Sequence, residues 1–542
     1  MIKKLFKNQM VLFGTFFAIV VVLSFFVYKD FGISTDEPIQ SDHLRVAGKK
    51  IFSTLGLLEY APQAIKDAPD IQNYPHRFYG VAAQYPLLAL EFFPDTFNTS
   101  TPAYWQVRHL YTRLLFVLAG FCMLLIFKKF TNSKLIIFVG LLLFFLHPRI
   151  SAHSFFNIKD SVFLSFFTFS MYFLFRYIDK PSTKNLVFLG LISAITVNVR
   201  MMGLLIPGFL SLYLVFSRVK KPEGRFNVFK FLQSESFKSF LSAAFIYSIV
   251  FVATLFLIWP SLWGSPLSTF NDAFNLFKKY DHWSGSVLFN GVKIPGSNLP
   301  FYYIPVWIGI TSPLAHLFLW VAGLLLPITY FLGAKKYFPK AYIPVGAWIF
   351  IVGTYSLLVI MNSVLYGGWR HVQYLFAPLV VLGVYFLDFA RRKFVRPIYF
   401  SLLIMVFASL LNTARWMIVN HPFHYVYFND LAGKNWDKKW DVDYWGISGR
   451  QLIGWMLENG DPDMEMRVSS SPWGDWNTRW NLALVPLAKR KDFSVVDFSS
   501  GEPNYNFSYY KNSSDDLVLD DYEELYSIRV DGKKISTIFV RY

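Results

Sequence analysis

Long apolar runs recur along the chain, and short segments that carry Lys and Arg separate them. A helix needs about 20 mostly apolar residues to cross the hydrocarbon core of a bilayer, and most runs approach this length. The pattern predicts a polytopic α-helical membrane protein with about eleven transmembrane helices. The expected spans lie at about 10–28, 112–127, 135–146, 161–175, 185–197, 202–216, 240–259, 313–332, 343–361, 374–387 and 398–411.

The segments between the spans alternate in charge. Segments predicted to be cytoplasmic each carry at least three Lys or Arg residues, whereas the short segments on the other side carry one or two. Basic residues favour the cytoplasmic side, and Lys3, Lys4 and Lys7 precede the first span. We therefore predict a protein of the cytoplasmic (inner) membrane with a cytoplasmic N-terminus. The first span lacks a small-residue cleavage site and is expected to stay uncleaved.

The composition changes after the last span. Residues 1–414 predict a transmembrane domain, and its outer segment 30–107 mixes apolar and polar residues as interfacial helices do. Residues 415–542 are rich in Asp, Asn, Trp and Tyr and contain short strand-like runs, which predicts a small extracytoplasmic α/β domain. Residues 304–310 are expected to form a re-entrant or interfacial piece.

The overall composition supports a membrane protein, because 54% of the 542 residues are hydrophobic and 20% are aromatic. The net charge of +17 comes from basic residues beside the spans, so no nucleic-acid partner is expected. The single cysteine, Cys122, excludes an intrachain disulfide.

The first candidate for chemistry is the pair Asp36-Glu37, just after the first span. Two carboxylates are costly in hydrocarbon, so they are expected in the interface or in a cavity. Polar residues of several other loops fall on the same predicted side: Arg108, His147, Arg149, His153, Lys159, Asp160, Arg200, Arg370 and His371. Acids and cations that converge there could deprotonate a hydroxyl and stabilise a departing phosphate.

Each of these residues also has a purely structural interpretation. Arg108 could anchor a span at the interface, and Lys159-Asp160 could be an ion pair of little energetic worth. His147 could start a turn, and the spacing of His147 and His153 does not define a metal site. The sequence has no glycine-rich nucleotide fingerprint, so a nucleotide-linked donor is not indicated.

The order of five motifs resembles the GT-C class of membrane glycosyltransferases, and within it the protein O-mannosyltransferase-like family (glycosyltransferase family 39) and its bacterial relatives. The motifs are Asp36-Glu37 after the first span, residues 147–149 with 157–160, residues 198–203, residues 368–371 with Tyr374 and Pro378, and residues 421–429 with 443–446.

This resemblance implies a sugar donor carried on a polyprenyl phosphate and an Asp general base, for which the matching residue is Asp36. Glu37 would shape the loop or contact substrate, and Asp160 would be the second acid. The donor phosphate would be bound by Arg370, Lys159, Arg200 and Arg108, and substrate by His147, Arg149, His153 and His371. Neither a metal nor another cofactor is expected, because cations of the chain can neutralise the leaving phosphate.

The resemblance leaves the acceptor open between a glycan, a lipid and a protein, because the tail replaces the lumenal β-trefoil domain of the eukaryotic family members. The transferred sugar could be a hexose or a pentose. A transporter or flippase of a lipid-linked sugar is a rival, although no internal repeat is evident. A second rival is a glycan ligase or polymerase that uses a diphosphate-linked glycan.

The charge pattern makes the orientation testable. A reporter that is active only in the cytoplasm should be silent when fused after Tyr542 and active when inserted after Lys180. A bright signal from the Tyr542 fusion would mean that one span has been miscounted.

Overall fold

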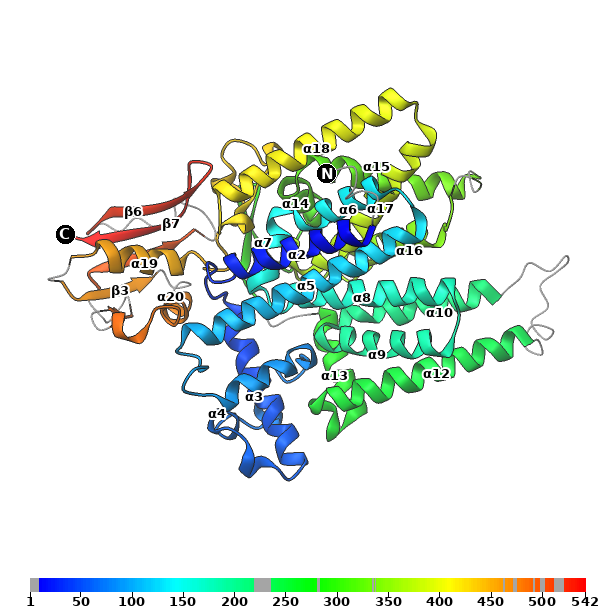
Figure 1. Cartoon of the computed structure of the whole chain (residues 1–542). Coiled ribbons are helices and arrows are strands. Elements are labelled where there is room, and N and C mark those ends of the chain that lie inside the picture. Colours follow the sequence, from blue (N-terminus) through cyan, green and yellow to red (C-terminus); the bar gives the residue numbers. More distant parts are fainter. Residues whose placement is uncertain are drawn as a thin grey trace.

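The computed structural model describes residues 9–218, 235–279, 283–333, 336, 338–461, 464–470, 475–490, 493–497, 503–510 and 521–542. A large helical bundle carries a smaller sheet domain at one end (Figure 1). The long helices of the bundle are α2 (Gln9–Val27), α5 (Pro102–Phe130), α6 (Lys134–Phe145), α8 (Asp160–Asp179), α9 (Thr183–Val199), α10 (Leu205–Arg218), α12 (Glu235–Ile258), α15 (Leu314–Phe331), α16 (Tyr342–Ile360), α17 (Phe376–Lys393) and α18 (Arg396–Val419). The predicted fold class is thereby confirmed.

Every predicted span coincides with one of these helices. Among the described residues, eight helices are long and apolar enough to cross a membrane, which makes the chain a multi-pass membrane protein. The count is nine if α6 and α7 (Pro148–Phe156), which meet at an angle of 60°, form one broken span. Because α9 and α10 are shorter apolar helices, the number of eleven stays a prediction.

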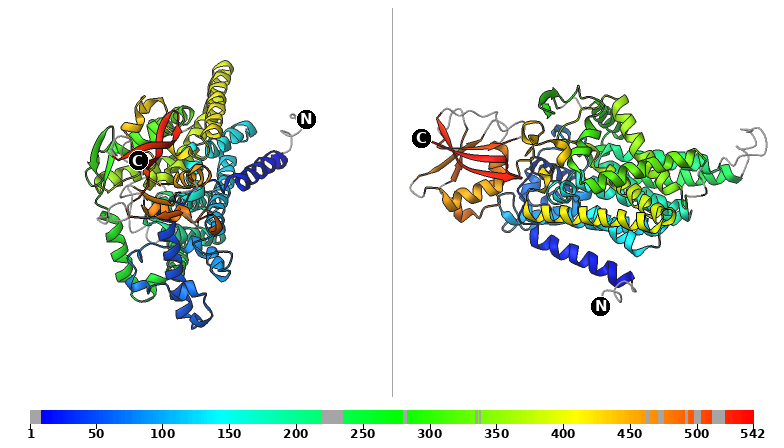
Figure 2. Two further views of the ribbon diagram at one scale, coloured as in Figure 1. Left: turned by 90° about the vertical axis from the view of Figure 1, so that its left-hand side faces the viewer. Right: turned by 90° about the horizontal axis from the view of Figure 1, so that it is seen from above.

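The bundle is built around α17. Within the apolar stretch of the span that contains α17, 89% of the residues are buried, whereas the value is 17% for α2 and for α12. The two peripheral helices therefore present most of their surface to lipid, and α2 lies apart along one flank of the bundle (Figure 2). Close approach of α15 to α17 depends on Gly323, where a Cβ would lie 2.6 Å from the Leu382 carbonyl.

The two ends of the bundle differ in charge. At one end, Asp179 binds Lys129 and Lys340, and Asp388 binds Arg391 and Arg392. This end carries the short basic segments between α5 and α6, between α8 and α9 and between α17 and α18, which were predicted to be cytoplasmic. The opposite end carries the sheet domain and the segment 30–107, which was predicted to lie outside (Figure 1). The grouping agrees with the charge analysis, while the side of the membrane that each end faces stays a prediction.

Segments expected to be outer loops contain more regular structure than predicted. Residues 148–156 form α7 because Pro148 starts the helix and the His147 side chain accepts a hydrogen bond from Ile150 N. The stretch 260–300 contains η5 (Pro260–Trp263), α13 (Pro266–Lys279), β1 (Ser286–Phe289) and β2 (Val292–Pro295). The re-entrant or interfacial candidate corresponds to the short helix α14 (Tyr303–Thr311).

The outer segment 30–107 forms a helical lobe below the bundle in Figure 1. Its elements are α3 (Asp36–Thr54), η1 (Leu58–Tyr60), α4 (Gln63–Lys66), η2 (Ile71–Asn73) and η3 (Ala82–Phe92). Further along the chain, the 3-10 turn η4 (Met201–Leu204) precedes α10, and η7 (Arg370–Leu375) precedes α17.

The C-terminal region forms a five-stranded mixed sheet with strand order β4-β3-β5-β7-β6. The strands are β3 (Met466–Ser470), β4 (Phe493–Val495), β5 (Tyr505–Tyr509), β6 (Tyr522–Val530) and β7 (Lys533–Arg541). The helices α19 (Gly449–Asn459) and α20 (Asp475–Leu482) pack against the sheet. The 3-10 turns η8 (His424–Val426), η9 (Asp430–Ala432), η10 (Trp436–Lys438) and η11 (Leu487–Lys489) complete the region. An α/β character was predicted for this region.

Some residues used for the sequence predictions lie outside the described residues. They are Lys3, Lys4 and Lys7 and most of the basic segment after α10.

The contact between α15 and α17 gives a stability prediction. Gly323→Ala places a methyl group against the backbone of Leu382, so the helices must separate, at a cost of about 1–3 kcal/mol. We expect a lower melting temperature in detergent. Gly14→Ala on α2, where a Cβ would meet no atom within 4 Å, is the matched control. Equal melting temperatures for both variants would contradict the close packing described here.

Candidate active site

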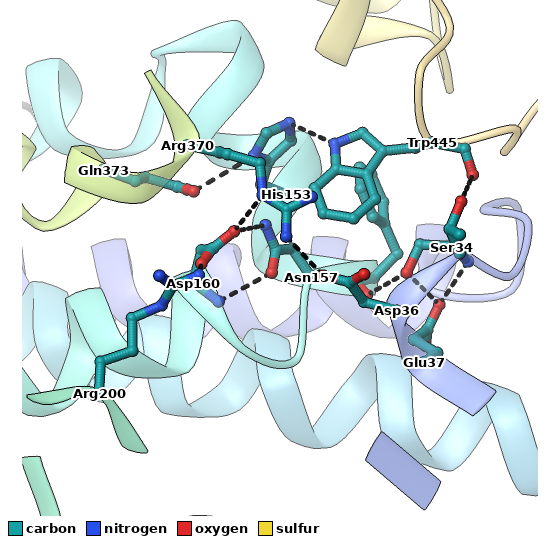
Figure 3. A network of polar contacts seen from close by, with 12 residues as sticks. Ser34, Asp36, Glu37, His153, Asn157, Asp160, Arg200, Arg370, Gln373 and Trp445 are labelled. Carbon is teal, nitrogen blue, oxygen red and sulfur yellow. Dashed lines mark hydrogen bonds and ion pairs between the residues drawn. The ribbon is translucent and has the colours of Figure 1, made fainter. Parts of the chain in front are cut away.

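Asp36 is the first residue of α3, at the end of the bundle that carries the sheet domain. A helix N-terminus favours a carboxylate, because the first backbone N–H groups have no partner within the helix. Asp36 Oδ2 accepts a hydrogen bond of 2.6 Å from Arg370 Nη2 (Figure 3). The Asp36 side chain is 25% exposed, so this carboxylate remains accessible from solvent.

Asp160, the first residue of α8, holds two guanidinium groups. Arg370 Nε lies 3.2 Å from Asp160 Oδ2, and Arg200 binds the other carboxylate oxygen (Figure 3). Asn157 Nδ2 also donates to Asp160 at 3.0 Å. A buried carboxylate is stable only when it is paired and hydrogen-bonded, and Asp160, which is 1% exposed, meets both conditions.

Arg370 is further fixed by aromatic rings from two other segments. Its guanidinium lies 4.3 Å from the ring centroid of Trp445 and 5.1 Å from that of Tyr366. Trp445 belongs to the chain between α18 and α19. Its indole N–H donates to His153 Nε2 at 3.3 Å, and His153 Nδ1 lies 3.2 Å from Gln373 Oε1. The two contacts together require the proton of the neutral imidazole to be on Nδ1.

A cavity of about 660 Å³ begins at these cations and extends along the bundle. Its polar end is lined by Lys159, Arg200, Arg370 and His371. The remaining wall is mostly apolar and comes largely from α10 and α16, which contribute Gly208, Phe209, Leu212, Phe350, Gly353 and Leu357. Leu212 and Leu357 are 51% and 41% exposed, so the apolar part opens at the side of the bundle.

Lys159 adds a third cation to the polar end. Its ammonium lies 3.5 Å from the ring centroid of Tyr79. Burial, helped by the nearby Arg200 cation, lowers the pKa of Lys159 to about 7. Two carboxylates thus face two guanidinium groups and one readily titrated amine, and this balance favours an anion in the cavity.

Arg149 and His153 lie behind Arg370, around a hollow of about 10 Å³ that holds no more than about one water molecule. Arg149 Nε donates to the Tyr427 carbonyl at 3.1 Å, and its guanidinium stacks on Phe428. Within the described residues, no group of three or more His, Cys, Asp or Glu side chains is placed to hold a metal ion.

Three predicted site residues do not line the cavity, and their side chains bind other groups of the chain. Glu37 accepts hydrogen bonds from the Ser34 backbone and hydroxyl and lies 3.0 Å from His109 Nε2. Arg108 donates to Gln84 Oε1 at 3.0 Å. His147 caps α7, and its Nε2 lies 3.1 Å from Ser312 Oγ.

A protein-family model matches a segment of the chain that contains Lys159, Asp160 and Arg200. Residues 103–225 match the family model described as dolichyl-phosphate-mannose-protein mannosyltransferase. This match confirms the resemblance that the motifs indicated, over a segment that runs from α5 through α10. No curated protein matches the chain.

Two solved structures are similar to the chain over almost its whole length. The apo structure of ArnT from Cupriavidus metallidurans has 11% sequence identity and a TM-score of 0.48, and the alignment covers 98% of each chain. The structure of the same protein bound to undecaprenyl phosphate has 12% identity and a TM-score of 0.43, with 97% of this chain and 98% of the other covered.

Sequence reasoning missed Trp445, Gln373, Tyr366 and Tyr79 as neighbours of the cations. Trp445 lies within one of the tail motifs that carried the family resemblance, so that motif was the available signal. The other three residues had no distinguishing pattern of their own.

Proposed function

We propose that the protein transfers a sugar from a polyprenyl-phosphate donor to an acceptor hydroxyl at the extracytoplasmic face of the membrane. The observation that carries this proposal is the division of one cavity into a cationic end and an apolar, laterally open groove. An isoprenoid phosphate has the same division, with an anionic head and a long apolar chain. The family match over residues 103–225 supports the same substrate class.

The donor phosphate would lie at Arg200, Arg370 and Lys159. Guanidinium groups bind phosphate oxygens through paired, charge-assisted hydrogen bonds, and the nearby apolar wall strengthens such contacts by excluding water. The isoprenoid chain would follow the wall of α10 and α16 and reach the bilayer through the side opening. His371 would border the phosphate from η7.

Asp36 would act as the general base. It removes the proton of the acceptor hydroxyl as the oxygen attacks the anomeric carbon. The bond between that carbon and the phosphate oxygen breaks, and polyprenyl phosphate leaves as an anion stabilised by the arginines. Because Arg370 lines the cavity and also binds Asp36, it would hold this base beside the scissile bond of a bound donor.

The remaining predicted residues would act through these groups. Asp160 would position Arg200 and Arg370, because its buried carboxylate binds both. Glu37 would shape the turn before α3 through Ser34, and His153 would hold Trp445 against Arg370.

The central test is Asp36→Asn. An amide cannot accept the hydroxyl proton, so transfer should fall by at least about 100-fold, or about 2.7 kcal/mol of barrier. Transfer is measured as label moving from a radiolabelled polyprenyl-phosphate sugar into products in membrane extract. Asp42→Asn, on the solvent-exposed side of the same helix, is the matched control and should keep wild-type transfer.

Two results would reject parts of this proposal. Full transfer by Asp36→Asn would remove Asp36 as the base. Label that only changes leaflet, without a new product, would indicate a carrier of lipid-linked sugars instead of a transferase.

The lowered pKa of Lys159 predicts that donor binding depends on pH. Below pH 7 its amine is charged and attracts the phosphate, whereas above pH 7 binding must first return a proton to it. A polyprenyl methyl phosphate keeps one negative charge throughout, so its affinity should fall by up to about tenfold per pH unit from 7 to 9. The charged groups around Lys159 are Arg200, Arg370, Asp36 and Asp160. Lys159→Arg stays charged and should flatten the profile. Equal slopes in both proteins would exclude Lys159 from phosphate binding.

A further inference from the structure

Asn481, on α20 of the C-terminal domain, is fully buried against the loop that leads to Asp36. Its Oδ1 accepts from Ile33 N at 2.9 Å, and its Nδ2 donates to Ile33 O at 3.1 Å. One side-chain amide therefore satisfies both backbone groups of Ile33, as a neighbouring β-strand would. A primary amide can do this because it contains a donor and an acceptor.

The same amide reaches the segment that carries Trp445. Asn481 Nδ2 lies 3.2 Å from the carbonyl oxygen of Gly446, the residue after Trp445. One side chain thus links the loop before the proposed base to the segment that stacks on Arg370.

Contacts around Asn481 leave these segments little freedom. Thr35 Oγ1 lies 3.1 Å from Asn477 Oδ1 and 3.3 Å from the carbonyl oxygen of Trp445. A Cβ at Gly32 would lie 2.1 Å from the Ile447 carbonyl oxygen. A Cβ at Gly446 would lie 2.0 Å from Asn477 Nδ2, and the φ of Gly446 is +66°. The loop before Asp36 and the segment around Trp445 therefore pack so closely with each other and with α20 that only glycine fits at positions 32 and 446.

We propose that the C-terminal domain is a working part of the transfer site and that Asn481 is the positioning residue that sets Asp36 and, through Trp445, Arg370. This inference rests on the proposed function, since it gives Asn481 a role in placing the proposed base. General-base catalysis needs the carboxylate within hydrogen-bond reach of the hydroxyl, and a displacement of about 1 Å can cost about 100-fold in rate. Asn481 is not among the residues that line the cavity, so its expected effect is on the geometry of the site.

The variants Asn481→Asp and Asn481→Leu distinguish the acceptor role of the side-chain amide from its donor role. The aspartate keeps the acceptor for Ile33 N but loses the donor to Ile33 O, Gly446 O and Asn477 O, and the leucine loses all four bonds. We expect kcat to fall by about 10- to 100-fold, and further for leucine than for aspartate. Affinity for polyprenyl methyl phosphate should stay within about twofold, because the cationic end of the cavity is retained. Asn459→Ala, at an exposed asparagine on α19, is the control and should match the wild type.

Hydrogen–deuterium exchange of the full-length protein gives a readout that does not depend on activity. In Asn481→Leu, a peptide covering residues 29–37 should exchange faster, while peptides from β5 and β7 should keep wild-type protection. If the sheet also loses protection, Asn481→Leu has disturbed the whole domain, and Thr35→Val tests the positioning role instead. It removes only a hydroxyl from the same contact and should still lower kcat while the sheet stays protected.

The outcomes distinguish this inference from the function it rests on. Wild-type kcat in Asn481→Asp and Thr35→Val, with Asp36→Asn inactive, would overturn the positioning role and leave the transferase intact. Full activity of Asp36→Asn would overturn the base, whatever Asn481 does. A loss of donor affinity equal to the loss of kcat in the Asn481 variants would also overturn the inference, because it would place Asn481 in donor binding.

Discussion

The arrangement of the site depends on one guanidinium group, that of Arg370, lying between two carboxylates. Asp160 holds it from the buried side and Asp36 from the accessible side. The three residues come from η7, α8 and α3, which are distant in sequence, so this ion-pair network ties three parts of the bundle together. Removing one partner of a buried ion pair leaves an uncompensated charge, which is why such a network tolerates few substitutions.

Much of this site could be predicted from the sequence, because membrane topology reduces the number of possible neighbours. Once Asp36, Asp160 and Arg370 are placed at the same end of the spans, their opposite charges favour a shared ion-pair network. The spans themselves follow from apolar runs. The strand-like runs in the tail predicted that this region contains strands, but not that they form one mixed sheet.

Details that depend on side-chain direction could not be predicted. Asp36 and Glu37 are neighbours, yet successive residues on a helix point about 100° apart, and Glu37 turns toward His109. Arg108 was predicted to bind the donor phosphate, but its guanidinium donates to Gln84. His147 uses its ring to cap a helix, which is uncommon for histidine and hides it from a propensity argument. The stacking of Trp445 on Arg370 joins residues 75 positions apart, and the tail motif that contains Trp445 singles out the residue but not its contact with Arg370.

The side opening of the cavity has a consequence for how the protein meets an apolar ligand. Leu212 and Leu357 border the cavity and are also exposed on the flank of the bundle. A molecule that enters there arrives by lateral diffusion within a leaflet, so its supply is set by its mole fraction in the surrounding lipid and not by its amount per litre. Added detergent or inert lipid then acts as a surface diluent, and occupancy in micelles and in vesicles is comparable only at equal surface density.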